Sequence, residues 1–271
     1  MTVRRYAACV EYDGSEFSGW QSQKGNIRTV QSLVEAALSK VADAPVAVVT
    51  AGRTDARVHA SHQVIHFDSD ADRPVFAWCR GANRFLTKDV RLRWVQLVDN
   101  EFHARFSALS RSYRFIIYND PIQSALYRNH VTPEPKSLDP LKMAEAGKAL
   151  LGEHDFTSFR AAGCQAQSPV RTMQYFNLMS KGPWIWFDVQ ANAFLQHMVR
   201  NIAGSLIEVG CGKRSVGWMA KVLAEKDRTL TGVTATANGL YLVGVEYPEE
   251  FALCSSRQDV CYWPESSNSE R

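Results

Sequence analysis

The sequence lacks the features of several special classes of protein. Its 271 residues contain no run of eighteen apolar side chains, so we expect no membrane-spanning helix. Its first residues show neither the apolar core nor the cleavage site of a secretory signal, which predicts a cytoplasmic protein. Its six cysteines include no CxxC pair, so neither a zinc site nor a disulfide framework is indicated, and we expect reduced thiols.

A strong net charge is also absent. The 31 basic residues nearly balance the 28 acidic residues and leave a net charge of +3. Binding to phosphate depends on local rather than total charge, and many arginines of the first 114 residues stand beside aromatic residues or glycine. This pattern is compatible with a nucleic-acid partner, and an ordinary solvated basic face would explain it equally well.

The composition, with 45 % apolar and 22 % charged residues, is that of a folded globular enzyme. Strand and helix patterns alternate in both halves, with hairpins between several strands. This favours an α+β fold with mixed, mainly antiparallel sheets flanked by helices. We expect an N-terminal catalytic α/β domain at 1–108, a C-terminal α/β domain at 109–250 and a loosely held polar tail at 251–271.

The sequence GRTDARVHA at residues 52–60 separates two segments with the pattern of buried strands, 45–50 and 63–68. A carboxylate in a loop between two strands is held rigidly and still reaches solvent, so Asp55 is the leading candidate for a catalytic residue. An aspartate near glycine also forms turns by hydrogen-bonding to its own backbone. The spacing alone does not decide between the two roles.

Three histidines follow Asp55, namely His59, His62 and His66, and this D-x3-H-x2-H-x3-H pattern has the residue types of a metal site. A metallohydrolase is therefore one hypothesis. The chain contains no HExxH motif, and His62 and His66 fall on or beside a predicted strand. We therefore favour a protein that uses neither a metal nor a cofactor.

An aromatic loop follows the first predicted strand, which ends at the turn signal Asp13-Gly14-Ser15. Trp20 and Gln21 in this loop have side chains of the kinds that stack on bases and hydrogen-bond to nucleotides. Burial of Trp20 in a small hydrophobic cluster is the alternative.

The sequence resembles the tRNA pseudouridine synthase A family over residues 6–248, nearly the whole chain. Besides 52–60, the matching segments are 12–21, 102–115, 155–160, 192–201 and 239–243, in the order that the family has. The resemblance implies the pseudouridine synthase fold, in which two similar α/β domains enclose a catalytic cleft. It also implies a homodimer that isomerises uridine to pseudouridine in the anticodon stem-loop of tRNA, at positions 38, 39 and 40.

The same resemblance assigns roles to individual residues. Asp55 is the expected nucleophile, Tyr113 the aromatic residue that stacks on the target base and a candidate relay for its C5 proton, and Arg200 the cation that pairs with Asp55 across the cleft. We expect contacts with the tRNA from a further set of basic, aromatic and amide side chains. These are Arg53, Arg57, His59, Trp20, Gln21, Arg105 and Arg160.

One residue departs from the family pattern, because Arg57 stands where the family has glycine. Glycine in such a loop serves a left-handed backbone or a close approach to the ligand. In the first case Arg57 costs roughly 1 kcal/mol of strain. In the second case it faces the RNA as an obstruction or as a phosphate contact. This departure leaves open an RNA-binding protein of the same fold with impaired catalysis.

Overall fold

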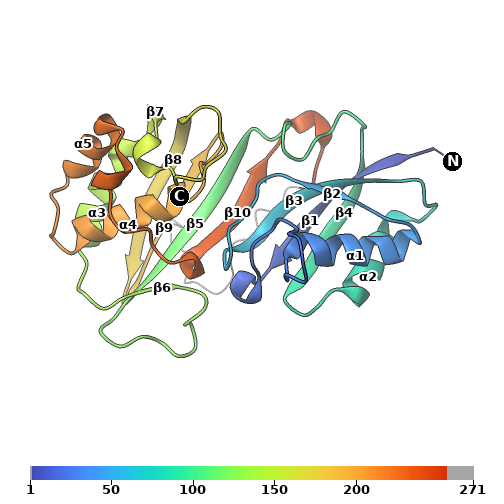
Figure 1. The fold of residues 1–271 in the computed structure, drawn as a ribbon, viewed down its shortest axis with the longest axis horizontal. Coiled ribbons are helices and arrows are strands. Elements are labelled where there is room, and N and C mark those ends of the chain that lie inside the picture. Colours follow the sequence, from blue (N-terminus) through green and yellow to red (C-terminus); the bar gives the residue numbers. More distant parts are fainter. Residues whose placement is uncertain (1, 255–271) are drawn as a thin grey trace, which may run out of the picture.

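The computed structural model describes residues 2–254, and ten strands of this part form one sheet (Figure 1). The strands are β1 (Arg4–Tyr12), β2 (Val48–Thr50), β3 (His59–Ser69), β4 (Val90–Val98), β5 (Ser110–Asn119), β6 (Thr132–Glu134), β7 (Gly152–Asp155), β8 (Val170–Lys181), β9 (Trp184–Ala191) and β10 (Leu240–Glu246). Their order is β4-β1-β3-β10-β5-β9-β8-β7, with β2 beside β3 and β6 beside β5. The pairs β3–β10 and β5–β6 are parallel and the others antiparallel, so the predicted mixed, mainly antiparallel pairing is confirmed.

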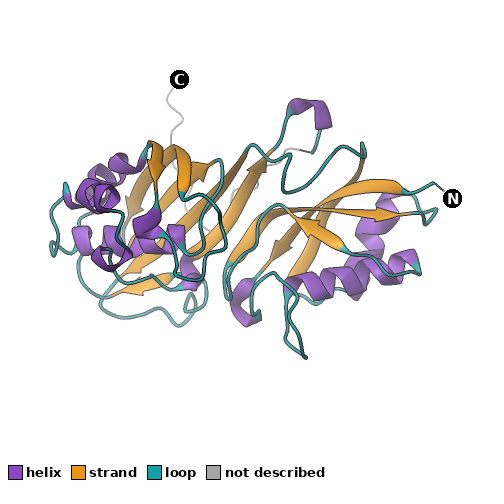
Figure 2. Ribbon diagram, turned by 45° about the horizontal axis from the view of Figure 1, so that its top comes forward, coloured by secondary structure: helices purple, strands orange, loops and turns teal. Residues whose placement is uncertain are grey.

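Five α-helices of the described part pack on the two ends of this sheet. They are α1 (Val30–Ala42), α2 (Val75–Phe85), α3 (Pro140–Gly147), α4 (Met198–Gly210) and α5 (Trp218–Glu225). Helix α2 contacts α1 and β4, whereas α3 contacts α4, α5 and β8. Figure 2 shows the helices, in purple, in two groups with strands running between them. None of the helices within residues 2–254 is long and apolar enough to cross a membrane.

Local sequence explains where α1 and α3 begin. The side chain of Thr29 accepts a hydrogen bond from the backbone N–H of Ser32 at the start of α1. Asp139 accepts hydrogen bonds from the backbone N–H groups of Leu141 and Lys142 at the start of α3. The first residue of α3 is Pro140, whose missing N–H would have no partner at that position.

The expectation of separate sheets in two domains needs correction, because β10 joins the halves into a single sheet. Tyr241 pairs with His59 of β3 in parallel register, and Leu242 pairs with Tyr113 of β5 in antiparallel register. The apolar pattern of β10 identifies a buried strand but not its partners, so the sequence does not place the last strand at the centre. The α+β class itself is confirmed.

The expected domain boundary at residue 108 falls between β4 and β5. Segments 1–108 and 109–250 share one sheet, because β10 of the second segment pairs with β3 of the first. Their division into two domains stays a prediction. The shared sheet has a direct consequence for the site, because only β10 separates the strand that follows Asp55 from the strand that carries Tyr113.

The expected tail at 251–271 begins in contact with the fold. The side-chain amide of Gln96 donates to the backbone carbonyl of Ala252, and the backbone N–H of Cys254 donates to Oε1 of Gln96. These bonds attach the first residues of the tail to β4, so the looseness expected from residue 251 onwards does not hold for them. The remaining residues, 255–271, lie outside the described part of the chain.

Candidate active site

The loop between β2 and β3 carries Asp55 and is fixed by side chains of the neighbouring strands. Gln63 of β3 is fully buried and donates from Nε2 to the backbone carbonyl of Gly52, at 2.6 Å. The hydroxyl groups of Tyr12 and Thr54 are hydrogen-bonded at 2.7 Å. Burial raises the pKa of Tyr12 to about 12, so its phenol stays protonated at neutral pH. Asp55 therefore stands on a loop with little freedom to move.

The aromatic loop after β1 supports the catalytic loop from its other side. The backbone N–H of Trp20 donates to the carbonyl of Thr54 at 3.0 Å, and the N–H of Arg57 donates to the carbonyl of Phe17 at 3.2 Å. Gly19 has a φ of +97°, and a Cβ atom there would lie 2.9 Å from the carbonyl oxygen of Thr54. Glycine is needed because the two backbones lie too close for a side chain.

The indole of Trp20 is only 1 % exposed, and its ring lies 6.0 Å from the ring of Tyr12. This burial favours the alternative of a small hydrophobic cluster, although Trp20 also lines the cavity described below, so its contact with a nucleotide stays a prediction. Gln21 is exposed beside it and lines the cavity described below, where its amide is hydrogen-bonded to the side chain of Gln31.

Asp55 is the first residue of a hydrogen-bonded turn, because the N–H of Val58 donates to its carbonyl at 3.2 Å. Arg57 occupies the third position of this turn with a φ of +65°. A type II turn needs a positive φ at that position and therefore prefers glycine. The left-handed backbone is thus the reason why glycine suits position 57, and Arg57 bears the strain. Its exposed side chain also lines the cavity.

Two cationic or potentially cationic groups contact one oxygen of Asp55. Nη1 of Arg200 lies 3.6 Å from Oδ2, and Nε2 of His197 lies 3.5 Å from the same atom. Nε of Arg200 also donates to the carbonyl of Ala235 at 2.8 Å. Burial lowers the pKa of Arg200, and the carboxylate of Asp55 acts in the opposite direction. The expected pair of Asp55 and Arg200 is present, whereas His197 was not singled out by the sequence.

Tyr113 of β5 is 9 % exposed and lines the same cavity. Its ring makes an edge-to-face contact with Phe194, with the ring centres 5.0 Å apart. Burial raises the pKa of Tyr113, and the nearby Tyr12 and Asp55 raise it further, so the phenol is protonated at neutral pH. The ring is thus held near the carboxylate, where a base could lie against it.

The cavity has a volume of about 1320 Å³ and is lined by both halves of the molecule. This is larger than the roughly 300–1,000 Å³ of typical small-molecule pockets. Among the described residues that line it, Asp55 is the only carboxylate. Six arginines also line it, namely Arg53, Arg57, Arg105, Arg111, Arg171 and Arg200. The site therefore suits a large polyanion.

Arg111 uses its guanidinium to hold backbone segments around the cavity. It donates to the carbonyl groups of Ala108, Asn192 and Ala51, each at 3.0 Å, and to that of Arg105 at 2.6 Å. Burial lowers the pKa of Arg111. Arg105 itself is exposed and lies over the ring of its neighbour in the chain, so its charge faces solvent.

Arg160 does not line the cavity, so the expectation of a direct contact with tRNA is not supported. Its Nη2 donates to the carbonyls of Cys164 and Ala166, at 2.6 and 2.7 Å. Cys164 and Ala166 belong to a loop that does line the cavity. Arg160 therefore acts on the site through the backbone of this loop.

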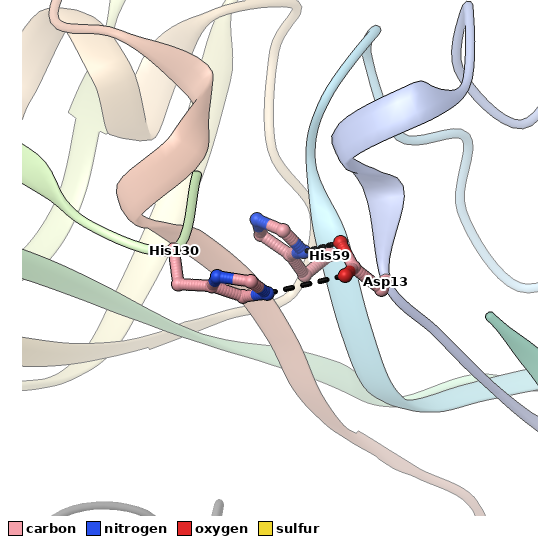
Figure 3. Close-up of side chains that lie close together, drawn as sticks. All are labelled: Asp13, His59 and His130. Atoms are coloured by element: carbon pink, nitrogen blue, oxygen red, sulfur yellow. Dashed lines mark hydrogen bonds and ion pairs between the residues drawn. The ribbon is translucent and has the colours of Figure 1, made fainter. Parts of the chain in front are cut away.

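His59 is 2 % exposed and belongs to a cluster with Asp13 and His130 (Figure 3). Its Nδ1 accepts a hydrogen bond from the N–H of Gly14 at 3.0 Å, and its Nε2 faces the carbonyl of Asn129 at 3.0 Å. The carboxylate of Asp13 lies 3.1 Å from Nδ1 of His59 and 3.1 Å from Nε2 of His130. His59 is thus buried where the two halves meet and does not line the cavity, so the structure gives no support to its expected contact with tRNA.

The metallohydrolase hypothesis is not supported by the positions of the three histidines. His62 lies 3.5 Å from the sulfur of Cys9, and His66 accepts a hydrogen bond from the N–H of Ala104. Within residues 2–254, the three do not converge into a group of metal ligands. The cluster around His59 is close enough for a metal, but hydrogen-bond partners already occupy both ring nitrogens of His59.

Replacing Arg57 with glycine should stabilise the protein. The Arg57→Gly variant relieves a left-handed backbone, so we expect the free energy of unfolding in urea to rise by about 1 kcal/mol. The matched control is Arg57→Lys, which keeps the charge and the strained backbone and should unfold like the wild type. A glycine variant no more stable than the lysine variant would show that the turn is unstrained.

Asp13 should contribute stability that disappears in acid. Burial raises the pKa of Asp13, but hydrogen bonds from His130 and from the N–H and hydroxyl groups of Ser15 outweigh this and hold it well below the usual range. A carboxylate with a lowered pKa stabilises the fold above its unfolded pKa of about 3.9 and loses this contribution as the pH falls. Asp13→Asn should therefore lower the Tm at about pH 7, and the difference should narrow towards about pH 3. Asp72, whose side chain is exposed, provides the control. If Asp72→Asn changed the Tm with pH in the same way as Asp13→Asn, the prediction would be contradicted.

Comparison with known proteins assigns the family. The sequence model described as tRNA pseudouridine synthase matches residues 8–107 and 146–248. A tRNA pseudouridine synthase A from Legionella pneumophila (strain Corby) is 53 % identical over 249 residues, covering 92 % of this chain and 95 % of the relative. The tRNA pseudouridine synthase A of Pseudomonas aeruginosa is 52 % identical over 93 % of this chain and 88 % of the relative. The tRNA pseudouridine synthase A of Photobacterium profundum is 49 % identical over 96 % of this chain and 100 % of the relative. The chain therefore belongs to the tRNA pseudouridine synthase family.

Proposed function

We propose that this chain converts uridine to pseudouridine in the anticodon stem-loop of tRNA, at positions 38, 39 and 40, with Asp55 as the nucleophile. As a member of its family it is an isomerase that acts on uridine in tRNA. One observation carries the proposal of the site. The carboxylate of Asp55 lies 3.6 Å from the guanidinium of Arg200, in a cavity where it is the only carboxylate among the described lining residues.

The reaction breaks the bond between N1 and C1′, turns the uracil and forms a bond between C5 and C1′. The proton on C5 is then lost and N1 gains one, so the product is an isomer. Asp55 can serve by attacking C1′, by attacking C6, or by accepting the 2′ proton as a glycal forms. Each route needs an ionised carboxylate, and the charge of Arg200 offsets the cost of holding one in a partly dry site.

The detached uracil must be kept in place until it rejoins the ribose. Tyr113 is proposed to stack on this base, supported by its position in the cavity wall and by the edge of Phe194 behind it. Because its phenol is protonated at neutral pH, Tyr113 can donate a hydrogen bond but cannot act directly as the base for the C5 proton. A water molecule or Asp55 is the proposed acceptor of that proton.

The target nucleotide has to leave its stack before the carboxylate can reach the ribose, at a cost of a few kcal/mol. Exposed arginines at the cavity are proposed to meet the phosphates and offset this cost. Arg53 and Arg57 suit this role, because both are exposed and neither has an ion-pair partner among residues 2–254. Gln21 and Arg105 stand at the same cavity and are proposed to contact the RNA beside them.

A homodimer in the cytoplasm completes the proposal, and its support is the family resemblance of the sequence. Sedimentation equilibrium should give twice the mass of the chain, which is 30.4 kDa. A monomer at the concentrations used for activity measurements would contradict it.

Asp55→Asn should abolish turnover while leaving RNA binding largely intact. The amide has the shape of the carboxylate but is neither a nucleophile nor a base, so we expect a loss of at least about a thousandfold. Release of tritium from tRNA labelled at C5 of uridine measures turnover, and gel retardation measures binding. If both fall equally, Asp55 has a structural role.

The same preparations decide the site of modification. Incubation of the wild type with tRNA transcripts, followed by chemical adduct formation and primer extension, should show stops at positions 38, 39 or 40, and Asp55→Asn should show none. Stops confined to other parts of the tRNA would overturn the proposed site choice and leave the chemistry unaffected. Tight binding without tritium release from the wild type would instead indicate an RNA-binding protein without catalysis.

A further inference from the structure

Five residues other than glycine have a positive φ within the described part of the chain. They are Asp43, Arg57, His197, Lys226 and Ala252. Asp43 and Lys226 end α1 and α5, where a left-handed residue is common. Arg57 and His197 instead lie in the active-site cavity with Asp55. Backbone strain of this kind is concentrated at functional sites, so it indicates a role for the side chain of the strained residue.

The backbone of His197 does not explain why the residue is a histidine. It has a φ of +61° and a ψ of 3° at the start of α4, and its side chain makes no capping hydrogen bond. The N–H of Met198 donates to the carbonyl of Leu195 at 3.0 Å, so His197 is the third residue of a turn. These angles are close to those of a type II turn, in which glycine is preferred at this position.

Neighbouring backbone holds this turn in place. The carbonyl of Gln196 accepts a hydrogen bond from the N–H of Ala161 at 3.1 Å, and the carbonyl of His197 accepts one from the N–H of Asn201 at 2.9 Å. These main-chain bonds fix the backbone of His197 on both sides.

The imidazole is aimed at Asp55. Nε2 of His197 lies 3.5 Å from Oδ2, the atom that Nη1 of Arg200 approaches to 3.6 Å. The shortest contact of each of the two residues with Asp55 is thus made to the same carboxylate oxygen, from two different positions on α4 and the turn before it.

We propose that His197 is a positioning residue, which together with Arg200 holds the carboxylate of Asp55 by Oδ2 and so keeps it in the orientation that the reaction needs. The inference deepens the proposed function and rests on it. It explains why a histidine stands where the backbone favours glycine, since the strain is offset by the alignment of the carboxylate. Misplacement of a reacting group by about 1 Å can cost a hundredfold in rate.

Two substitutions separate the backbone from the side chain. His197→Gly removes the imidazole and relaxes the left-handed backbone, so the protein should unfold at the same or a higher temperature. Its kcat should fall roughly tenfold to a hundredfold, while the KM for tRNA changes little. His197→Gln keeps the strain but places an amide N–H within reach of Oδ2, and it should recover most of the kcat.

Lys226→Gly is the matched control, because it relaxes a left-handed residue that does not line the cavity. It should raise the Tm and leave kcat unchanged. A kcat of His197→Gly equal to that of the active wild type would overturn the inference alone, as would a His197→Gln variant as slow as the glycine variant. A wild type that forms no pseudouridine in the same assay would overturn the proposed function, and this inference with it.

Discussion

The contact between the carboxylate of Asp55 and the guanidinium of Arg200 depends on a sheet that continues through the middle of the molecule. Asp55 precedes β3 in the first half of the chain, and Arg200 lies in the first turn of α4 in the second half. Backbone pairing of β10 with both β3 and β5 sets the spacing of these halves. The side chains are 30 % and 17 % exposed, so water screens their attraction only in part. A charge pair that spans a cleft is stable here because its supports are strands of one continuous sheet.

The sequence identified the carboxylate, its cation and the aromatic ring, but only through a resemblance that extended over nearly the whole chain. Spacing alone left Asp55 as a turn residue or a catalyst, and the structure shows it as the first residue of a turn that also lines the cavity. The turn is confirmed, and the catalytic role of Asp55 stays a prediction. Periodicity also gave the α+β class, but hydrogen-bond partners of a buried strand are set by distant segments, so the central place of β10 was not predictable.

The burial of Trp20 and that of His59, neither of which the sequence established, have the same physical origin. Each residue stands in or beside a glycine-containing loop, which in a sequence suggests an accessible position. In the fold, however, each side chain is covered by the ring of a residue from another element. Trp20 is buried by loop packing beside Tyr12, and His59 stacks on the ring of Tyr241 with the ring centres 4.6 Å apart. At Arg57 the sequence offered two explanations, and its φ supports the left-handed backbone while its exposed side chain at the cavity leaves room for the phosphate contact as well. His197 carried no comparable signal, since a backbone angle leaves no trace in residue spacing.

Four of the six arginines of the cavity divide into two groups with different roles. Arg111 directs its donors to four backbone carbonyls, and Arg200 directs Nε to one carbonyl and Nη1 to Asp55, so both charges are committed to the protein. Arg53 and Arg57 are exposed and have no ion-pair partner in the described residues. Cations of the second group attract any polyanion, because phosphate carries no sequence information. A surface that only attracts polyanions needs no more than the second group, and what this site adds is the contact of Arg200 with Asp55, which the bond from Arg200 to the backbone of Ala235 helps to hold in place.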